Sequence, residues 1–367
     1  MKYKLEEKDV YNNSHFILDA HCMEKDTNSN SKYRLFYRSR KTYIYDSKDE
    51  KVYFFKWACF RNFCFDDNRE YVYALRENAY RNKKEQRIIN CYHVPSGELI
   101  KQYEINKNTL KGYRNYIFKY MDLFDNKIVI VFYHQLYDEL NSLKFEVLVY
   151  DLLTENSFIV PIHNELKFDH SLTCVRKPYF IFNNQLYLDL IDSQNKHAIY
   201  QLNDQKELVY KKALNVRLNI FHVCNNSNII YIYYDEENSL MNIYLYDGSL
   251  NYIDAIKIRK YNIDTNFLSL SSAVEIYIDI ELKKMYIFLM DKERASMLYV
   301  DKLNEKRKLG IEFSKDMIFG GVVNSNKIIV GFQNTNTKSP NYLINSYRLL
   351  DLTYILCQNI NNIKSKD

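Results

Sequence analysis

Glycine and proline are scarce in this chain of 367 residues, which contains 7 Gly and 4 Pro. So few glycines exclude a Gly-rich loop that cradles phosphate, and no GxGxxG or GxxxxGK[ST] motif occurs. The turns must therefore be built from Asn, Asp, Ser and Lys. No run of about 18 uninterrupted apolar residues is present, so we expect no membrane span.

Signatures of metal and cofactor binding are missing as well. The 7 cysteines are irregularly spaced and form no CxxC, which favours reduced, buried thiols inside a cell. The 8 histidines show no HExxH or other metal-ligand spacing. We therefore expect no metal, no cofactor and no catalytic residue. The N-terminus has no apolar signal segment, so we expect an intracellular protein, cytoplasmic or nuclear.

Aromatic and β-branched residues are what the chain has in abundance. Hydrophobic residues make up 47% of it, and it contains 35 Tyr against a single Trp. Tyr packs well on a pleated surface while its hydroxyl stays wet, so this composition favours β-strands around a sizeable core. The net charge of +5 is modest for this size and does not mark a dedicated nucleic-acid-binding protein.

Short runs rich in Ile, Tyr and Val recur after turns rich in Asn and Asp, at a spacing of about 50 residues. In the stretch that begins at residue 228, the runs Ile229–Tyr234, Met241–Tyr246 and Tyr252–Ile258 are separated by two polar turns. Seven such runs begin at Tyr33, Tyr71, Ile128, Leu186, Ile229, Met285 and Ile328. One apolar run precedes each turn and others follow, so each unit predicts four short strands.

These units predict an all-β fold, a seven-bladed β-propeller, with six or eight blades as alternatives. Each blade would be a four-stranded antiparallel sheet of about 50 residues. A sheet with two apolar faces cannot stand alone, and blades stacked around an axis bury both faces. No linker-like segment divides the chain, so residues 1–367 are predicted to form a single propeller domain. Residues 2–6 are a candidate for a strand added to the terminal blade.

A column of residue pairs marks the third predicted strand of each unit. The pairs are Tyr45-Asp46, Tyr92-His93, Tyr150-Asp151, Tyr200-Gln201, Tyr246-Asp247, Val300-Asp301 and Tyr347-Arg348. At this column the chain resembles the WD-repeat propellers, in which an aromatic-Asp pair ends the third strand of each blade. The Gly-His pair of that family is absent, and the repeat here is longer. The resemblance implies a rigid scaffold that binds proteins or peptides, usually without catalysis.

Basic residues are concentrated in three segments of the first half of the chain. They are Arg38, Arg40 and Lys41; then Arg76, Arg81, Lys83, Lys84 and Arg87; then Lys107, Lys111 and Arg114, with Tyr113 between them. In a propeller these segments would lie on one rim and converge on one sector of it. Basic side chains interleaved with Tyr suit nucleic acid or an acidic peptide. An ordinary solvated set of loops is the alternative, because Glu77 and Glu85 dilute the charge.

Three functions are compatible with these observations. The leading prediction is a non-enzymatic scaffold that mediates protein–protein interaction within a larger assembly, because a whole-chain repeat is present without a chemical constellation. The first alternative is a propeller that associates with RNA or ribonucleoprotein through the basic rim. The second is an enzyme or small-ligand binder that uses the axial channel, into which Asp189 and Asp192 could project.

Overall fold

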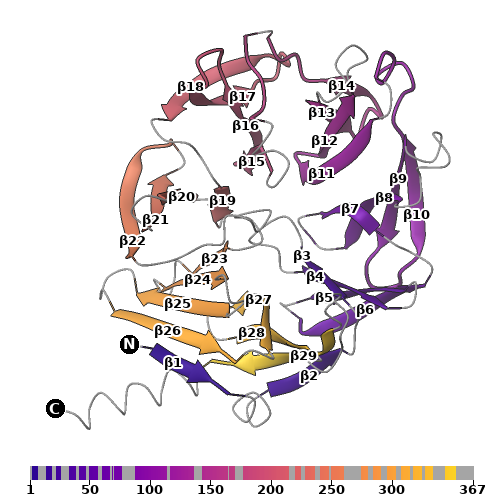
Figure 1. Cartoon of the computed structure of the whole chain (residues 1–367). Coiled ribbons are helices and arrows are strands. Elements are labelled where there is room, and N and C mark those ends of the chain that lie inside the picture. Colours follow the sequence, from indigo (N-terminus) through magenta and orange to yellow (C-terminus); the bar gives the residue numbers. More distant parts are fainter. Residues whose placement is uncertain are drawn as a thin grey trace.

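The strands of the described residues form seven sheets arranged in a ring (Figure 1). The computed structural model describes residues 2–6, 14–18, 22–25, 33–38, 41–46, 49–56, 60–66, 68, 70–76, 87–113, 116–135, 143–163, 165–169, 177–214, 220–224, 228–235, 240–247, 249–259, 274–279, 284–290, 296–302, 307–314, 317–324, 327–333 and 344–352. The arrangement confirms the predicted all-β propeller of antiparallel blades, and the seven sheets fit the predicted number of blades.

The first four blades follow the order of the sequence, each with its first strand toward the centre of the ring (Figure 1). Blade I comprises β3 (Cys22–Lys25), β4 (Tyr33–Arg38), β5 (Lys41–Asp46) and β6 (Lys51–Lys56). Blade II comprises β7 (Phe60–Phe65), β8 (Tyr71–Arg76), β9 (Ile88–His93) and β10 (Leu99–Glu104). Blade III comprises β11 (Ile117–Phe124), β12 (Lys127–Gln135), β13 (Leu143–Asp151) and β14 (Ser157–Ile159). Blade IV comprises β15 (Tyr179–Phe182), β16 (Gln185–Ile191), β17 (His197–Leu202) and β18 (Leu208–Leu214).

Blade V is built like the first four, whereas blades VI and VII each also contain a strand from the N-terminal part of the chain. Blade V comprises β19 (Ile220–Cys224), β20 (Asn228–Asp235), β21 (Leu240–Asp247) and β22 (Tyr252–Arg259). Blade VI contains β23 (Val274–Asp279), β24 (Lys284–Met290), β25 (Ser296–Lys302) and β26 (Arg307–Phe313). Blade VII contains β27 (Met317–Asn324), β28 (Lys327–Gln333) and β29 (Ile344–Asp351). The second strand of every blade begins at, or one residue before, the run that the sequence repeat identified.

The N-terminal strands close the ring. Strand β2 (Ser14–Leu18) pairs antiparallel with β29 and supplies the fourth strand of blade VII. Strand β1 (Lys2–Leu5) pairs in parallel with β26 and becomes a fifth strand of blade VI. The prediction that residues 2–6 add a strand to the terminal blade is wrong, because this strand joins blade VI, the blade before it. The sequence also predicts a last strand at 354–357 (YILC), and these residues lie outside the described part of the chain.

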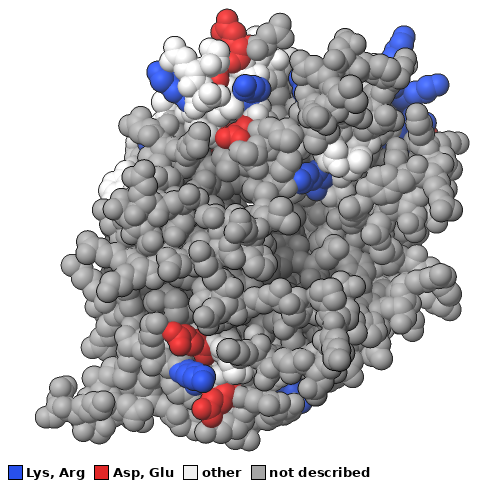
Figure 2. Space-filling view, viewed as in Figure 1, with Lys and Arg blue, Asp and Glu red and all other residues white. Residues whose placement is uncertain are grey.

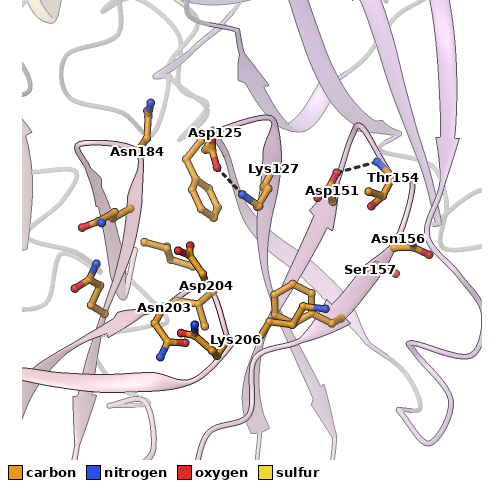
Figure 3. Close-up of a pocket in the computed structure, with 17 residues that line it drawn as sticks. Asp125, Lys127, Asp151, Thr154, Asn156, Ser157, Asn184, Asn203, Asp204 and Lys206 are labelled. Carbon is orange, nitrogen blue, oxygen red and sulfur yellow. Dashed lines mark hydrogen bonds and ion pairs between the residues drawn. The ribbon is translucent and has the colours of Figure 1, made fainter.

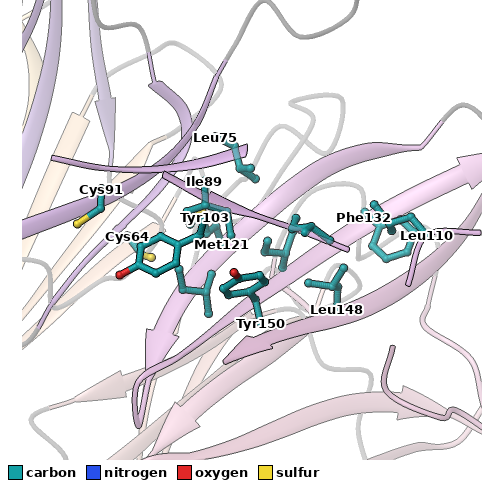
Figure 4. Packing of buried hydrophobic residues seen from close by; sticks show 13 residues of the cluster. Cys64, Leu75, Ile89, Cys91, Tyr103, Leu110, Met121, Phe132, Leu148 and Tyr150 are labelled. Carbon is teal, nitrogen blue, oxygen red and sulfur yellow. The ribbon is translucent and has the colours of Figure 1, made fainter. Parts of the chain in front are cut away.

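The core lies between blades. One buried cluster joins Leu75 and Ile89 of blade II to Ile130, Phe132 and other residues of blade III (Figure 4). A second cluster joins blades III and IV, and further clusters join blades I and II and blades IV and V. Each fully buried large apolar side chain contributes roughly 1.5–3 kcal/mol. Face-to-face stacking therefore supplies the burial that one four-stranded sheet lacks.

The described turns between the third and fourth strands, those of blades I to V, share an unusual backbone conformation. In five blades one residue of this turn has a positive φ, and four of the five are not glycine. They are Glu50 (53°), Gly97 (71°), Glu155 (56°), Lys206 (65°) and Leu250 (63°). A non-glycine residue in the left-handed region costs roughly 1–2 kcal/mol. The scarcity of glycine in the sequence is therefore met by strained turns.

Two further predictions concern cysteines and membranes. Cys64 and Cys91 are buried free thiols, as predicted for these positions. Burial raises the pKa of the Cys91 thiol, because the thiolate would be poorly solvated there. Within the part of the chain that the structure describes, no helix has the length and apolarity needed to cross a membrane.

Candidate functional site

A polar cleft of about 550 Å³ opens where blades III and IV meet (Figure 3). Four turns line it, two from each blade: those between the first and second strands and those between the third and fourth. In an antiparallel four-stranded blade these two turns lie at the same end of the strands. We call this end the turn face, and the opposite end the loop face. The cleft volume falls within the range of ordinary small-molecule sites.

Several polar side chains of the cleft serve to build the turns. The Asp151 carboxylate accepts hydrogen bonds from the backbone amides of Leu153 and Thr154, both at 2.9 Å. These bonds, Thr154 first, hold the pKa of Asp151 below its usual value. The Asn203 side chain accepts from the Glu207 amide at 2.7 Å. These two groups fix the backbone and are not available to a ligand.

The two ammonium groups of the cleft are also engaged. Lys127 forms an ion pair of 2.5 Å with Asp125, which lies two residues earlier in the same turn. Lys206, from blade IV, lies 4.5 Å from the ring centroid of Phe158 in blade III, a cation–π contact across the blade boundary. Figure 3 shows the Asp125–Lys127 pair across the cleft from Asn203, Asp204 and Lys206.

Five polar side chains of the cleft remain uncommitted. Among the described residues, no side-chain hydrogen bond or ion pair is recorded for four amides and one carboxylate: Asn156, Asn184, Gln201, Gln205 and Asp204. All but Gln201 are exposed. The cleft therefore offers hydrogen-bond donors and acceptors of neutral amides, together with one carboxylate, to a bound molecule.

A second polar cluster links the innermost strands of the same two blades. Asp122 of β11 accepts hydrogen bonds from the Lys177 ammonium at 2.5 Å and from the Tyr179 hydroxyl at 2.7 Å. Burial, followed by the Asp122 carboxylate, raises the pKa of Tyr179 far above its ordinary value. Tyr179 therefore stays protonated and acts as a hydrogen-bond donor. Because its members are paired with one another, the cluster fastens β15 to β11.

The acids expected near the axis lie elsewhere. Asp189 is buried on β16, the second strand of blade IV, and its carboxylate lies 3.0 Å from Nδ1 of His197. Asp169 lies 3.6 Å from the other nitrogen of the same ring. Asp192 accepts hydrogen bonds from the backbone amides of Gln194 and Lys196 and thus fixes a turn. In the described portion no group of three His, Cys, Asp or Glu side chains is placed to hold a metal ion.

The structure describes part of the predicted basic rim. Arg38, the last residue of β4, lies opposite Lys41, the first residue of β5, in the backbone register of the two strands. Arg76 is the last residue of β8. Lys107 and Lys111 are exposed in the segment between β10 and β11. Five members lie outside the described residues: Arg40, Arg81, Lys83, Lys84 and Arg114. Figure 2 shows the described basic residues dispersed over the visible face, with acidic residues beside several of them.

Two members of the predicted rim are engaged in the fold. The Arg87 guanidinium is only 15% exposed and lies 3.3 Å from the Glu104 carboxylate. The Tyr113 ring packs edge-on against Phe132 and His134, with centroids 5.3 and 4.8 Å away. Burial raises the pKa of Tyr113. These contacts give both residues a structural role, and contact of the rim with nucleic acid stays a prediction.

Comparison with known proteins identifies the fold and no family. No protein-family model and no curated protein matches the sequence. Among solved structures, the chain is similar to a prolyl endopeptidase (7% identity, TM-score 0.50, 86% of this chain and 47% of the other). It is also similar to dipeptidyl peptidase 4 of Porphyromonas gingivalis (11%, 0.49, 85% and 48%) and to the β-propeller domain of the trilobed protease of Pyrococcus furiosus (12%, 0.48, 92% and 97%). The chain spans about half the length of the first two.

These neighbours correct two predictions. The prolyl endopeptidase among the similar solved structures is an enzyme, which contradicts the non-enzymatic scaffold and the prediction that the chain is not an enzyme. The scaffold was inferred from the lack of a catalytic motif, and a propeller assembles its sites from turns that lie far apart in sequence. At these identities the similarity itself establishes the propeller fold. The WD-repeat resemblance is confirmed only as a propeller.

Proposed function

We propose that the chain is a propeller of the enzyme or small-ligand-binding kind, and that its ligand occupies the cleft between blades III and IV. One observation carries the proposal: a concave site of about 550 Å³ contains five polar side chains that have no side-chain hydrogen bond or ion pair within the described part of the chain. Uncommitted polar groups that converge in a cleft are the usual mark of a ligand site. The axial position is not supported, since Asp189 and Asp192 are used by the fold.

Catalysis in this cleft would rest on Asp204. Its carboxylate is exposed and stands opposite the Asp125–Lys127 ion pair (Figure 3). A carboxylate with no other partner can accept a proton from a bound hydroxyl group or from water. The prolyl endopeptidase among the similar structures supports an enzymatic role over a scaffolding one.

A ligand screen with a blocked cleft tests the proposal. Ligand-observed NMR would be run on the wild-type chain with a mixed panel of saccharides, sugar phosphates, nucleotides, amino acids and dipeptides. The Gln205→Trp variant places a large side chain in the cleft, and Gln194→Trp makes the same change on an exposed turn at the loop face of the same blade. We expect binding that Gln205→Trp abolishes and Gln194→Trp leaves intact. If no compound binds, or both variants bind equally well, the cleft is not the ligand site.

A further inference from the structure

We infer that the ligand of the cleft is an uncharged, polyhydroxylated molecule of the saccharide class. The inference rests on the proposed function and concerns what the same cleft selects. It starts from the charges of the lining residues. Three carboxylates, those of Asp125, Asp151 and Asp204, face two ammonium groups, those of Lys127 and Lys206.

Anionic ligands are disfavoured because neither ammonium group is available. Lys127 is held by Asp125, and Lys206 is turned over the Phe158 ring of the adjacent blade. A phosphate or carboxylate entering the cleft would have to break one of these contacts and would approach the unpaired Asp204 carboxylate. Like charges at such distances repel, and the effect is larger in a partly buried cleft than in water.

Hydroxyl groups match what the cleft offers. A primary amide donates through its nitrogen and accepts through its oxygen, so Asn156, Gln201 and Gln205 can each bond a hydroxyl group in either direction. Asp204 accepts from a hydroxyl donor with the added strength of a charged acceptor. The four groups come from both blades, so a ligand with several adjacent hydroxyls could bridge the blade boundary, whereas an apolar ligand would leave them all unsatisfied.

Binding of matched sugar pairs distinguishes these possibilities. Glucose, galactose, mannose, maltose and lactose would be titrated by calorimetry, alongside glucose 6-phosphate and mannose 6-phosphate. Two variants are compared with the wild type: Asp204→Asn, which removes the charge in the cleft, and Glu165→Gln, which removes an exposed charge between blades III and IV. Both sites are exposed, so both variants should fold normally.

We expect at least one neutral sugar to bind more tightly than the phosphorylated sugars. Asp204→Asn should weaken that binding about tenfold, because a charged hydrogen bond becomes a neutral one, and Glu165→Gln should leave it unchanged. If a phosphorylated sugar binds more tightly and Asp204→Asn strengthens it, the ligand is anionic and the inference is wrong while the cleft stands. If no sugar binds but another compound of the panel binds in a Gln205→Trp-sensitive manner, the saccharide class alone is wrong. If nothing binds in the cleft, the proposed function fails too.

Discussion

Replacing the left-handed turn residues by glycine should have unequal consequences at sites that share the same backbone conformation. Each of these residues contacts the preceding blade. Glu155 pairs with Lys101 of blade II at 2.7 Å, and Leu250 packs against the buried cluster of blade IV that contains Phe180. The other turns behave alike, since Glu50 pairs with Lys327 of blade VII and Lys206 covers Phe158. The turn residue is therefore both strained and useful.

The balance can be worked out for two of the turns. Glycine relieves roughly 1–2 kcal/mol of left-handed strain and loses roughly 0.5–1 kcal/mol through the greater freedom of the unfolded chain. For Glu155→Gly the lost contact is an exposed ion pair, which contributes little to stability, so the free energy of unfolding should change by no more than about 1.5 kcal/mol. Leu250 is 7% exposed, and deleting a buried leucine costs about 2–5 kcal/mol. We expect Leu250→Gly to destabilise by roughly 2–4 kcal/mol.

Equilibrium unfolding in urea, followed by circular dichroism, measures both variants. Leu250→Asn serves as a second test, because Asn tolerates a positive φ but cannot fill the apolar site, and it should be destabilised as well. The opposite substitution can be made at Gly97, the glycine that occupies the equivalent position in the turn of blade II. A Cβ there would lie 3.0 Å from the Phe54 carbonyl oxygen of blade I, so Gly97→Ala should also destabilise. If Leu250→Gly is as stable as Glu155→Gly, the leucine does not hold the two blades together and the reasoning fails.

Three further predictions concern the inner cluster, the closure and alkaline pH. Asp122→Ala should lower the free energy of unfolding, measured in urea, by about 3 kcal/mol, because it leaves the Lys177 ammonium and the Tyr179 hydroxyl without their acceptor. Asp122→Asn should lower it less, and an equal decrease in the two variants would refute this prediction. Deleting residues 1–20 removes both β1 and β2, whereas deleting residues 1–10 removes β1 alone. The longer deletion should lower the melting temperature far more than the shorter one. An equal decrease in melting temperature for the two deletions would contradict the pairing of β2 with β29. Burial raises the pKa of Tyr150 to about 12, so the free energy of unfolding should fall as pH rises from about 10 to 12. In Tyr150→Phe the free energy of unfolding should fall less steeply with pH over this range. If Tyr150→Phe shows the same dependence on pH as the wild type, the hydroxyl group of Tyr150 is not buried.

The repeat could be predicted from the sequence because it is local. Turns rich in Asn and Asp precede the second strand of most blades. In blade IV the turn residues Asn183 and Asn184 have the positive φ values, 48° and 57°, that a tight two-residue hairpin needs. The third-strand column was less reliable. In blade IV the residue that anchors the turn is Asn203, two positions after the predicted Gln201. The aromatic residue was the visible signal, but the side-chain oxygen at the end of the strand fixes the turn.

The closure of the ring by β1 and β2 and the cleft between blades III and IV could not be predicted from the sequence. Both depend on contacts between residues that are remote in sequence. Nothing in residues 2–6 specifies β26 as their partner, because any exposed strand edge offers the same backbone groups. Nor do Asn156 and Asp204 differ in sequence from the solvated residues of other turns. They line the same cleft because blades III and IV stack. Signals of this kind become visible only when corresponding turns of adjacent units are compared as a set.

The contact that joins blades III and IV is also a wall of the cleft. Lys206 occupies the strained position of its turn, covers Phe158 across the boundary and lines the cleft. A residue that both holds two blades and keeps its own charge away from the ligand explains how an amide-lined site can persist beside lysines. It follows that Lys206→Gly should change stability little, as calculated for Glu155→Gly, yet alter ligand binding, because strain relief offsets the lost contact while the wall is removed.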